Sequence, residues 1–555
     1  MRFRAGQSQV LSTFRPSDLR AKPASGQGER DDMKLSPCLV LCSMAAVFVH
    51  VDDSWSTPLD DYVSLPDPAF QWALENTIQG QGYTAYVLDM TSQSWRSASE
   101  VDRTEWQHWV RVIQPHAATS GTALLWIDGG SNDSNPPAPT TVDPILELVA
   151  LQTGSVVVDL SYIPNQRLKF SDEADPRYVA SGRTEDEIIA YTWDKFLRTG
   201  DATWPLQLPM TKAAVRAMDA VQQFMPGAPG GALTIDDFVV GGGSKRGWAT
   251  WTTAAVDSRV RAILPAVIDV LNVEPSLQHH HDVYGFWSWA LQDYVDMGIT
   301  DWIDTPEMAA LLDIVDPYSY RERYTMPKYV VNATGDEFFL PDSSQFYFDD
   351  LPGPKYLRYV PNASHSLSGS DAAVSLVAFH RAMLADAELP AFSWSIDGNT
   401  IIVESDEPVA ARLWQATNPT ARDFRLNPDG PGQGTGPQWT STLLADTGGG
   451  VFVGAVEPPF DAWTAFLVEL EFDSGVPGLP YKFTTPVQVI PEPAALPTIV
   501  ALVLCFVRRM RCLRPSAHRA MSPVVRARRP LRGPAQASSS ARDRWRGPRL
   551  PACCR

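Results

Sequence analysis

The segment Asp237–Trp248, with the sequence DFVVGGGSKRGW, limits what this chain can fold into more than any other feature. A short apolar run leads into three glycines, then Ser244, then a stretch with helical pattern. Glycines on both sides of a serine allow a tight turn from strand to helix, which lifts the serine Oγ above the edge of a sheet. The pattern therefore predicts a nucleophile. A phosphate loop is disfavoured because G-x-x-x-x-G-K-[ST] is absent and Arg246 replaces the last glycine of G-x-G-x-x-G.

An activated serine of this kind needs an acid and then a histidine later in the chain. Asp336 follows a glycine at the end of an expected strand over residues 328–332. His365 lies in the loop after the next expected strand, over 356–361. We predict Asp336 as the acid and His365 as the base. The alternative acids are Glu337, Asp342 and Asp269.

The oxyanion that such a serine generates requires backbone N–H donors. The residue after the nucleophile, Lys245, is expected to supply one of them. The second is expected from the loop after the strand Thr122–Ile127, where Gly130 and Ser131 are equal candidates.

Aromatic and basic residues near these motifs are candidates for a substrate pocket. They are Arg246, Trp248, Trp287 and His281. Core packing is the alternative reading for each tryptophan. His281 ends a run of three histidines that cannot all face one ion from a helix, so we predict neither a metal site nor a cofactor.

Strand and helix signals alternate through the middle of the chain. Expected strands are 122–127, 155–160, 237–240, 262–268, 328–332 and 356–361, and expected helices are 210–224, 246–256, 284–297 and 372–385. This alternation predicts an α/β domain over 51–390 with a doubly wound, mostly parallel sheet. The long aromatic-rich segment 269–326 is expected to form a helical cap, and residues 161–209 a second insertion. Short β-prone segments separated by turns then predict a small all-β sandwich over 391–487.

Both ends of the chain differ from this body. We expect residues 1–32 to be a disordered leader or a wrongly assigned start, and 33–50 a secretory signal peptide. Pro491-Glu-Pro, an apolar run and an arginine cluster follow near the other end. They make 488–511 resemble a PEP-CTERM sorting signal. That resemblance implies exosortase processing, transient membrane contact and export in a Gram-negative bacterium, to the periplasm, cell surface or medium. Residues 512–555 are expected to be a disordered, arginine-rich tail.

Charge and cysteine content restrict the partners of the body. Residues 34–507 hold 26 basic and 59 acidic side chains, so a phosphate backbone is repelled and nucleic acid is an unsuitable partner. All six cysteines lie before residue 43 or after residue 504, so the body has no thiol nucleophile and needs no disulfide.

Several long motifs resemble the PhoPQ-activated pathogenicity-related proteins. They are Gly243–Trp248, Pro265–Asn272, Asp316–Tyr320, Met326–Lys328, Gly335–Asp342 and Leu351–Asn362 followed by His365. The resemblance covers about 54–485. It implies an α/β-hydrolase fold with a C-terminal β domain and a triad of Ser244, Asp336 and His365. It implies no particular substrate.

The sequence thus predicts an exported serine hydrolase that cleaves a small-molecule or peptide ester or amide. The spacing Gly242-x-Ser244-x-x-Gly247 is similar to that of glucuronoyl esterases and slightly favours an ester. An aminopeptidase-type serine peptidase is the first alternative, and it would need an acidic pair for a free amine. A non-catalytic envelope protein that binds glycan or a protein is the second.

Overall fold

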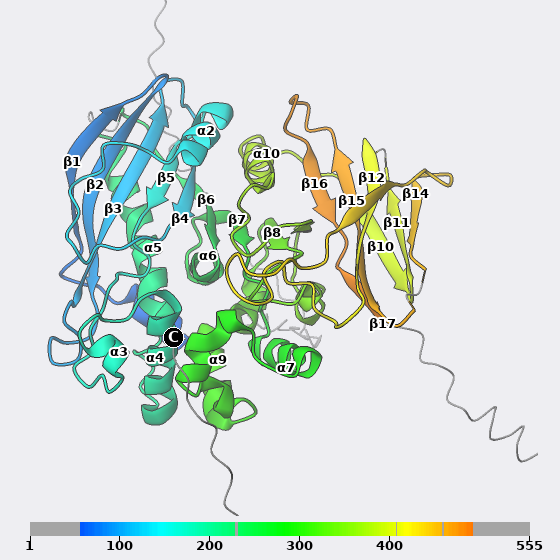
Figure 1. Cartoon of the computed structure of the whole chain (residues 1–555). Helices are drawn as coiled ribbons and strands as arrows, with labels where there is room; N and C mark the ends of the chain where they lie inside the picture. The colour runs from blue at the N-terminus through cyan, green and yellow to red at the C-terminus, as the bar shows by residue number, and fades with distance from the viewer. Residues whose placement is uncertain (1–55, 228–230, 407, 458–459, 492–555) are drawn as a thin grey trace, which may run out of the picture. The chain divides into compact units, whose positions relative to one another are not determined.

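A mixed nine-stranded sheet forms the centre of the computed structural model, which describes residues 56–227, 231–406, 408–457 and 460–491 (Figure 1). The strand order is β1-β2-β3-β5-β4-β6-β7-β8-β9. The bounds are β1 Gln71–Gln79, β2 Tyr83–Ser94, β3 Glu105–Pro115, β4 Thr122–Ile127, β5 Val157–Leu160, β6 Asp237–Gly243, β7 Val260–Ala266, β8 Lys328–Ala333 and β9 Lys355–Val360. The predicted leader, signal peptide and tail, and all six cysteines, lie outside the described residues.

Six of these strands, β4 to β9, run parallel to one another. This parallel part agrees with the α/β pattern read from the sequence. The antiparallel strands β1, β2 and β3 were not anticipated. They join the sheet because β3 pairs antiparallel with β5. In β3, buried and more exposed residues alternate along much of the strand, which is the period-two signal of a half-covered sheet.

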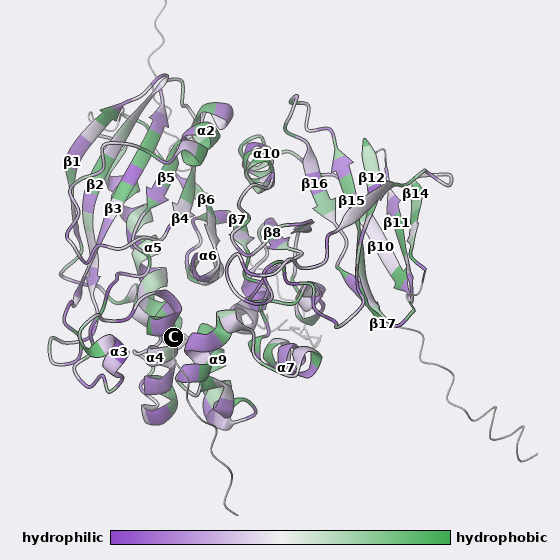
Figure 2. Cartoon of the chain, in the orientation of Figure 1, coloured by the Kyte–Doolittle hydropathy of each residue, from purple (hydrophilic) through white to green (hydrophobic). Residues whose placement is uncertain are grey.

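Helices cover both faces of the sheet. Successive residues of one strand point to opposite faces, so Leu124 and Leu125 enter two different apolar cores. One core includes α5 (Gln207–Phe224) and α6 (Lys245–Val256), and the other includes α2 (Pro144–Thr153) and α10 (Ala372–Leu384). The helices alternate hydrophobic and hydrophilic stretches in Figure 2, as expected where one side of each helix packs on a sheet.

The turn from β6 to α6 is tightly packed. Ser244 has φ 57° and ψ −127°, a left-handed conformation that is costly for a residue with a Cβ. The Ser244 N–H donates to the Ala266 carbonyl of β7 at 2.8 Å. A Cβ added at Gly247 would lie 3.0 Å from the carbonyl oxygens of both Ala266 and Gly242. Glycine is therefore required there for the helix to approach the strands.

The segment between β7 and β8 is helical, as predicted for a cap. It contains α7 (Val273–Tyr284), η1 (Trp289–Leu291), α8 (Gln292–Asp296), η2 (Ile299–Trp302), α9 (Pro306–Val315) and η3 (Pro317–Arg323). The predicted single helix over 284–297 is wrong. Gly285 has φ 72° and ends α7, and a 3₁₀ turn follows before α8 begins.

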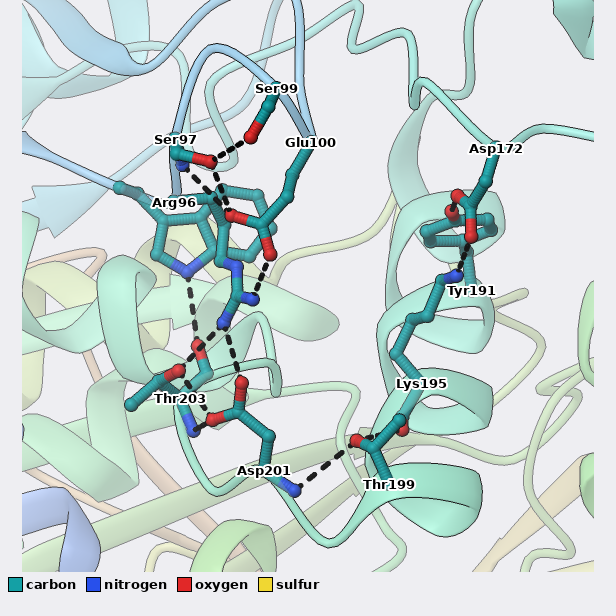
Figure 3. Close-up of polar contacts among 11 residues, drawn as sticks. Arg96, Ser97, Ser99, Glu100, Asp172, Tyr191, Lys195, Thr199, Asp201 and Thr203 are labelled. Carbon is teal, nitrogen blue, oxygen red and sulfur yellow. Dashed lines mark hydrogen bonds and ion pairs between the residues drawn. The ribbon is translucent and has the colours of Figure 1, made fainter.

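A second helical insertion contains α3 (Pro176–Val179) and α4 (Glu185–Thr199). Polar contacts fasten the end of α4 to the loop after β2 (Figure 3). Arg96 donates to Asp201 at 3.1 Å and to Thr203 at 2.6 Å, and its guanidinium lies over the Trp204 ring. Lys195 and Tyr191 of α4 both contact Asp172. These contacts fix the position of α4, whose first turn reaches the candidate site.

The C-terminal part is all-β and consists of two sheets. One has the order β10-β11-β14, and the other is β13-β12-β15-β16 with β17 added on β15. The bounds are β10 Phe392–Asp397, β11 Thr400–Ser405, β12 Ala410–Asn418, β13 Thr440–Leu443, β14 Val451–Ala455, β15 Trp463–Phe472, β16 Tyr481–Thr484 and β17 Gln488–Pro491. Residues 488–491 thus belong to this sheet and not to a sorting segment, because their backbone pairs with β15. The rest of the sorting segment lies outside the described residues. Among the described residues, no helix is both long and apolar enough to cross a bilayer.

Gly242 and Gly243, two of the three glycines before Ser244, give a matched test of this packing. Gly242→Ala should lower the free energy of unfolding by about 1–3 kcal/mol, because its Cβ would lie 2.8 Å from the Arg246 carbonyl oxygen. Gly243→Ala should change it by less than about 0.5 kcal/mol, because only Val267 comes within 4 Å, at 3.9 Å. Urea denaturation followed by circular dichroism measures both. Equal destabilisation of the two variants would contradict the tight turn.

Candidate active site

Ser244, His365 and Asp336 form a continuous hydrogen-bonded chain. The Ser244 Oγ lies 2.8 Å from His365 Nε2. The other ring nitrogen, Nδ1, lies 2.9 Å and 2.8 Å from the two carboxylate oxygens of Asp336. With its proton on Nδ1, the imidazole donates to Asp336 and accepts from Ser244. The three residues that the sequence singled out are therefore brought together in the geometry of a serine–histidine–acid triad.

Each of these side chains stands at the end of a parallel strand. Ser244 follows β6, Asp336 follows β8 and His365 follows β9. The carboxyl ends of parallel strands share one edge of the sheet, which is where α/β proteins place their ligands. Asp336 is buried, and its Oδ1 accepts the backbone N–H groups of Phe338 and Phe339 at 2.8 and 3.3 Å. The Phe338 ring also packs on the imidazole, 4.3 Å between centroids.

The three alternative acids occupy other positions. Glu337 Oε2 accepts the backbone N–H of His365 at 2.9 Å and does not reach the ring. Asp342 pairs with His279 and Arg422. Asp269 accepts the hydroxyls of Tyr347 and Tyr359, each at 2.6 Å. Asp336 is thus the candidate whose carboxylate contacts the imidazole.

A loop of the all-β part, residues 419–439 between β12 and β13, contacts the segment that carries Asp336. Leu426 N–H donates to the Gly335 carbonyl at 2.9 Å, and Asn427 Nδ2 donates to Glu337 Oε1 at 2.5 Å. Trp289 Nε1 donates to the Asn427 carbonyl at 2.9 Å. Glu337 therefore links this loop to the backbone of His365. The sequence carried no local signal for these contacts.

The predicted oxyanion donors lie at two places. Lys245 is the first residue of α6 and lines the pocket beside Ser244. Gly130 has φ 100° and lies against the Tyr162 ring, and its carbonyl accepts Gln166 Nε2 at 2.7 Å. Ser131 Oγ donates to Asp133 at 2.9 Å. The close approach of Gly129 to the Arg246 guanidinium brings this loop near the nucleophile turn, but Gly130 and Ser131 do not line the pocket.

The pocket beside Ser244 holds about 840 Å³ of space free of protein atoms, including its open mouth. Its wall is mainly apolar and comes from α4, α6, the cap and the loop after β8. Trp248 lines it as predicted. Asp186 and Trp193 of α4 also line it, and the sequence analysis missed both.

The prediction for His281 is wrong by one position. Val273, Ser276, Leu277 and His280 line the pocket, and this i, i+3, i+4, i+7 spacing is one face of α7. His281 falls outside that face and is exposed. Trp287 does not line the pocket but stacks on His280, 5.6 Å between ring centroids. Burial lowers the pKa of His280 to about 3, so this imidazole is neutral.

The two basic residues after Ser244 are engaged by acids of α4. Lys245 Nζ lies 3.0 Å from Glu185 and 2.9 Å from Asp186. Arg246 pairs with Glu185 at 2.6 Å and donates to the Ile163 carbonyl at 2.5 Å. Burial raises the pKa of Glu185, but the nearby cations Lys245 and Arg246 lower it further, to about 2. In the described ranges, His, Asp and Glu side chains form no group of three suited to a metal ion.

The loop from the all-β part gives a testable role to a distant residue. Asn427→Ala should slow covalent labelling of Ser244 by a fluorophosphonate about tenfold, because Glu337 loses the partner that steadies the His365 backbone. Asn399→Ala is the control, since Asn399 is equally half-buried and contacts only its own all-β part at Val456. Equal labelling rates for the folded parent and Asn427→Ala would contradict this role.

Comparisons with known proteins place this site in a family. The sequence model of the PhoPQ-activated pathogenicity-related proteins matches residues 59–425. Autocrine proliferation repressor protein A of Dictyostelium discoideum is 40% identical over 482 residues, 83% of this chain and 94% of that protein.

Solved structures with partial similarity have low sequence identity. Acetyl xylan esterase 1 from Thermoanaerobacterium has TM-score 0.38 and 16% identity, covering 56% of this chain and 87% of the esterase. A glucuronoyl esterase from Solibacter usitatus has TM-score 0.30 and 13% identity, covering 56% and 86%. The family match and the Dictyostelium relative together show that this chain belongs to the PhoPQ-activated pathogenicity-related protein family.

Proposed function

We propose that this protein is a serine hydrolase that cleaves an ester by acyl transfer, with Ser244 as nucleophile. The observation that carries the proposal is the chain from Ser244 Oγ through His365 to Asp336, at 2.8 and 2.8 Å, on a strained turn between strand and helix. The order of the parallel strands, with β4 between β5 and β6, supports an α/β-hydrolase fold.

In the proposed reaction, Ser244 Oγ attacks the carbonyl carbon while its proton passes to His365 Nε2. Asp336 holds the ring with Nδ1 facing the carboxylate and stabilises the imidazolium that forms. The imidazolium then protonates the leaving alcohol, and an acyl-enzyme remains on Ser244. Water then attacks this acyl group while His365 accepts its proton. The bond between the acyl carbon and Ser244 Oγ breaks, the acid leaves, and His365 returns the proton to Oγ.

The N-terminus of α6 supports the same chemistry. The Lys245 N–H belongs to the first turn of that helix, whose free N–H groups and dipole favour developing negative charge. We propose that it stabilises the oxyanion together with the loop 128–131. Gly130 and Ser131 remain equal candidates for the second donor.

The charges around Ser244 favour an esterase over an aminopeptidase. An aminopeptidase would need acidic side chains free to bind an amine. Glu185 and Asp186 form an acidic pair at the start of α4, where Asp186 lines the pocket, and both are paired with Lys245 or Arg246. We also retain export of the protein as a proposal, and it is compatible with a body that contains no cysteine.

Labelling by a fluorophosphonate tests the nucleophile directly. The full chain should gain one adduct by intact mass, and Ser244→Ala should gain none. Asp336→Asn should label about 10³–10⁴-fold more slowly, because the imidazole loses the group that fixes its tautomer. Asp342→Asn is the control, since its carboxylate pairs with His279 and Arg422 and does not touch His365. A folded parent that stays unlabelled would overturn the proposal.

A further inference from the structure

We propose that the pocket beside Ser244 binds an uncharged, apolar acyl group larger than acetyl, and that it rejects acyl groups that carry a carboxylate. This inference rests on the proposed function and names its substrate class.

The shape and chemistry of the wall point to an apolar group. The side chains that face the cavity include Trp193, Trp248, Leu277, Leu291, Ile299 and Phe339. They come from α4, α6, the cap and the loop after β8, so apolar residues converge on the space from several directions. These apolar side chains offer more wall than an acetyl group could cover, so a small acyl group would leave part of the wall in contact with water.

The cations near Ser244 are already neutralised. Lys245 Nζ lies between Glu185 and Asp186, and Asp186 also accepts the Tyr294 hydroxyl at 3.0 Å. Arg246 is held by Glu185 and the Ile163 carbonyl. A substrate carboxylate would have to displace one of these half-buried acids from its cation. The displaced acid would then be left without its cation.

Several other polar groups of the wall are hydrogen-bonded within the protein. Asp269 is held by two tyrosine hydroxyls, and His280 Nε2 accepts the Ser288 N–H at 3.1 Å. Ser276 Oγ donates to the Leu271 carbonyl at 3.2 Å. A charged group that entered this mainly apolar cavity would lose its water without gaining an opposite charge, which is unfavourable.

A series of p-nitrophenyl esters with one leaving group tests the acyl group alone. Each fully buried methylene should raise kcat/KM about fourfold. The four additional methylenes of hexanoate thus set an upper limit of about 250-fold over acetate, and with partial burial we expect at least about tenfold. The monoglutarate ester, whose acyl chain ends in a carboxylate, should be at least about 100-fold poorer than hexanoate. Rates measured with Ser244→Ala are subtracted as background. A flat series, or a preference for acetate or glutarate, would overturn the inference.

Two variants test the two parts of the argument separately. Asp186→Asn keeps an oxygen for Tyr294 but removes one charge that holds Lys245. It should raise kcat/KM for glutarate relative to hexanoate about tenfold, whereas Asp194→Asn, on the same helix and paired with Arg198, should not. Leu277→Trp narrows the cavity from a half-buried position and should lower the rate for hexanoate and spare acetate.

The outcomes separate this inference from the proposed function. Loss of fluorophosphonate labelling together with ester rates equal to those of Ser244→Ala means that the protein is not a serine hydrolase. Labelling of Ser244 together with a preference for charged or acetyl esters retains the hydrolase and overturns the apolar pocket. An unchanged glutarate-to-hexanoate ratio in folded Asp186→Asn also overturns the charge argument.

Discussion

The close contact between α6 and the ends of β6 and β7 is the constraint on which the site depends. Ser244 adopts its costly backbone conformation because its N–H is held by β7 and because Gly242 and Gly247 leave no side chain in the way. The same turn starts α6, whose first residue, Lys245, lines the pocket. A single local packing arrangement thus determines the direction of the serine hydroxyl and the position of the neighbouring backbone donor.

The positions that follow strands could be predicted from the sequence. Ser244, Asp336 and His365 each come directly after a short apolar run, so local pattern and chain order identified them without any knowledge of contacts. The strand Thr122–Ile127 was also predicted with its observed bounds. The cap was recognised as helical, but its internal breaks were not, because the glycine that ends α7 lies within a continuous aromatic-rich pattern.

The residues that sequence reasoning missed depend on contacts between distant segments. Asp186 and Trp193 reach the pocket from α4, which is held in place by its packing in the core and by contacts with Arg96 and Asp172. His280 rather than His281 lines the cavity because of the rotation of α7, and this rotation is set by the packing of the whole helix. The ion pairs of Lys245 and Arg246 were also missed, because their acidic partners lie far earlier in the chain.

The position of the loop 419–439 in the chain affects when the candidate active site can form during synthesis. Ser244, Asp336 and His365 all leave the ribosome before Asn427 does. The hydrogen bond that steadies Glu337, and through it the His365 backbone, is therefore absent from a growing chain. The family match at 59–425 ends inside this same loop. The site is therefore complete only after the C-terminal part has been synthesised. A nascent polypeptide contains Ser244, Asp336 and His365 before it contains the loop that contacts Glu337.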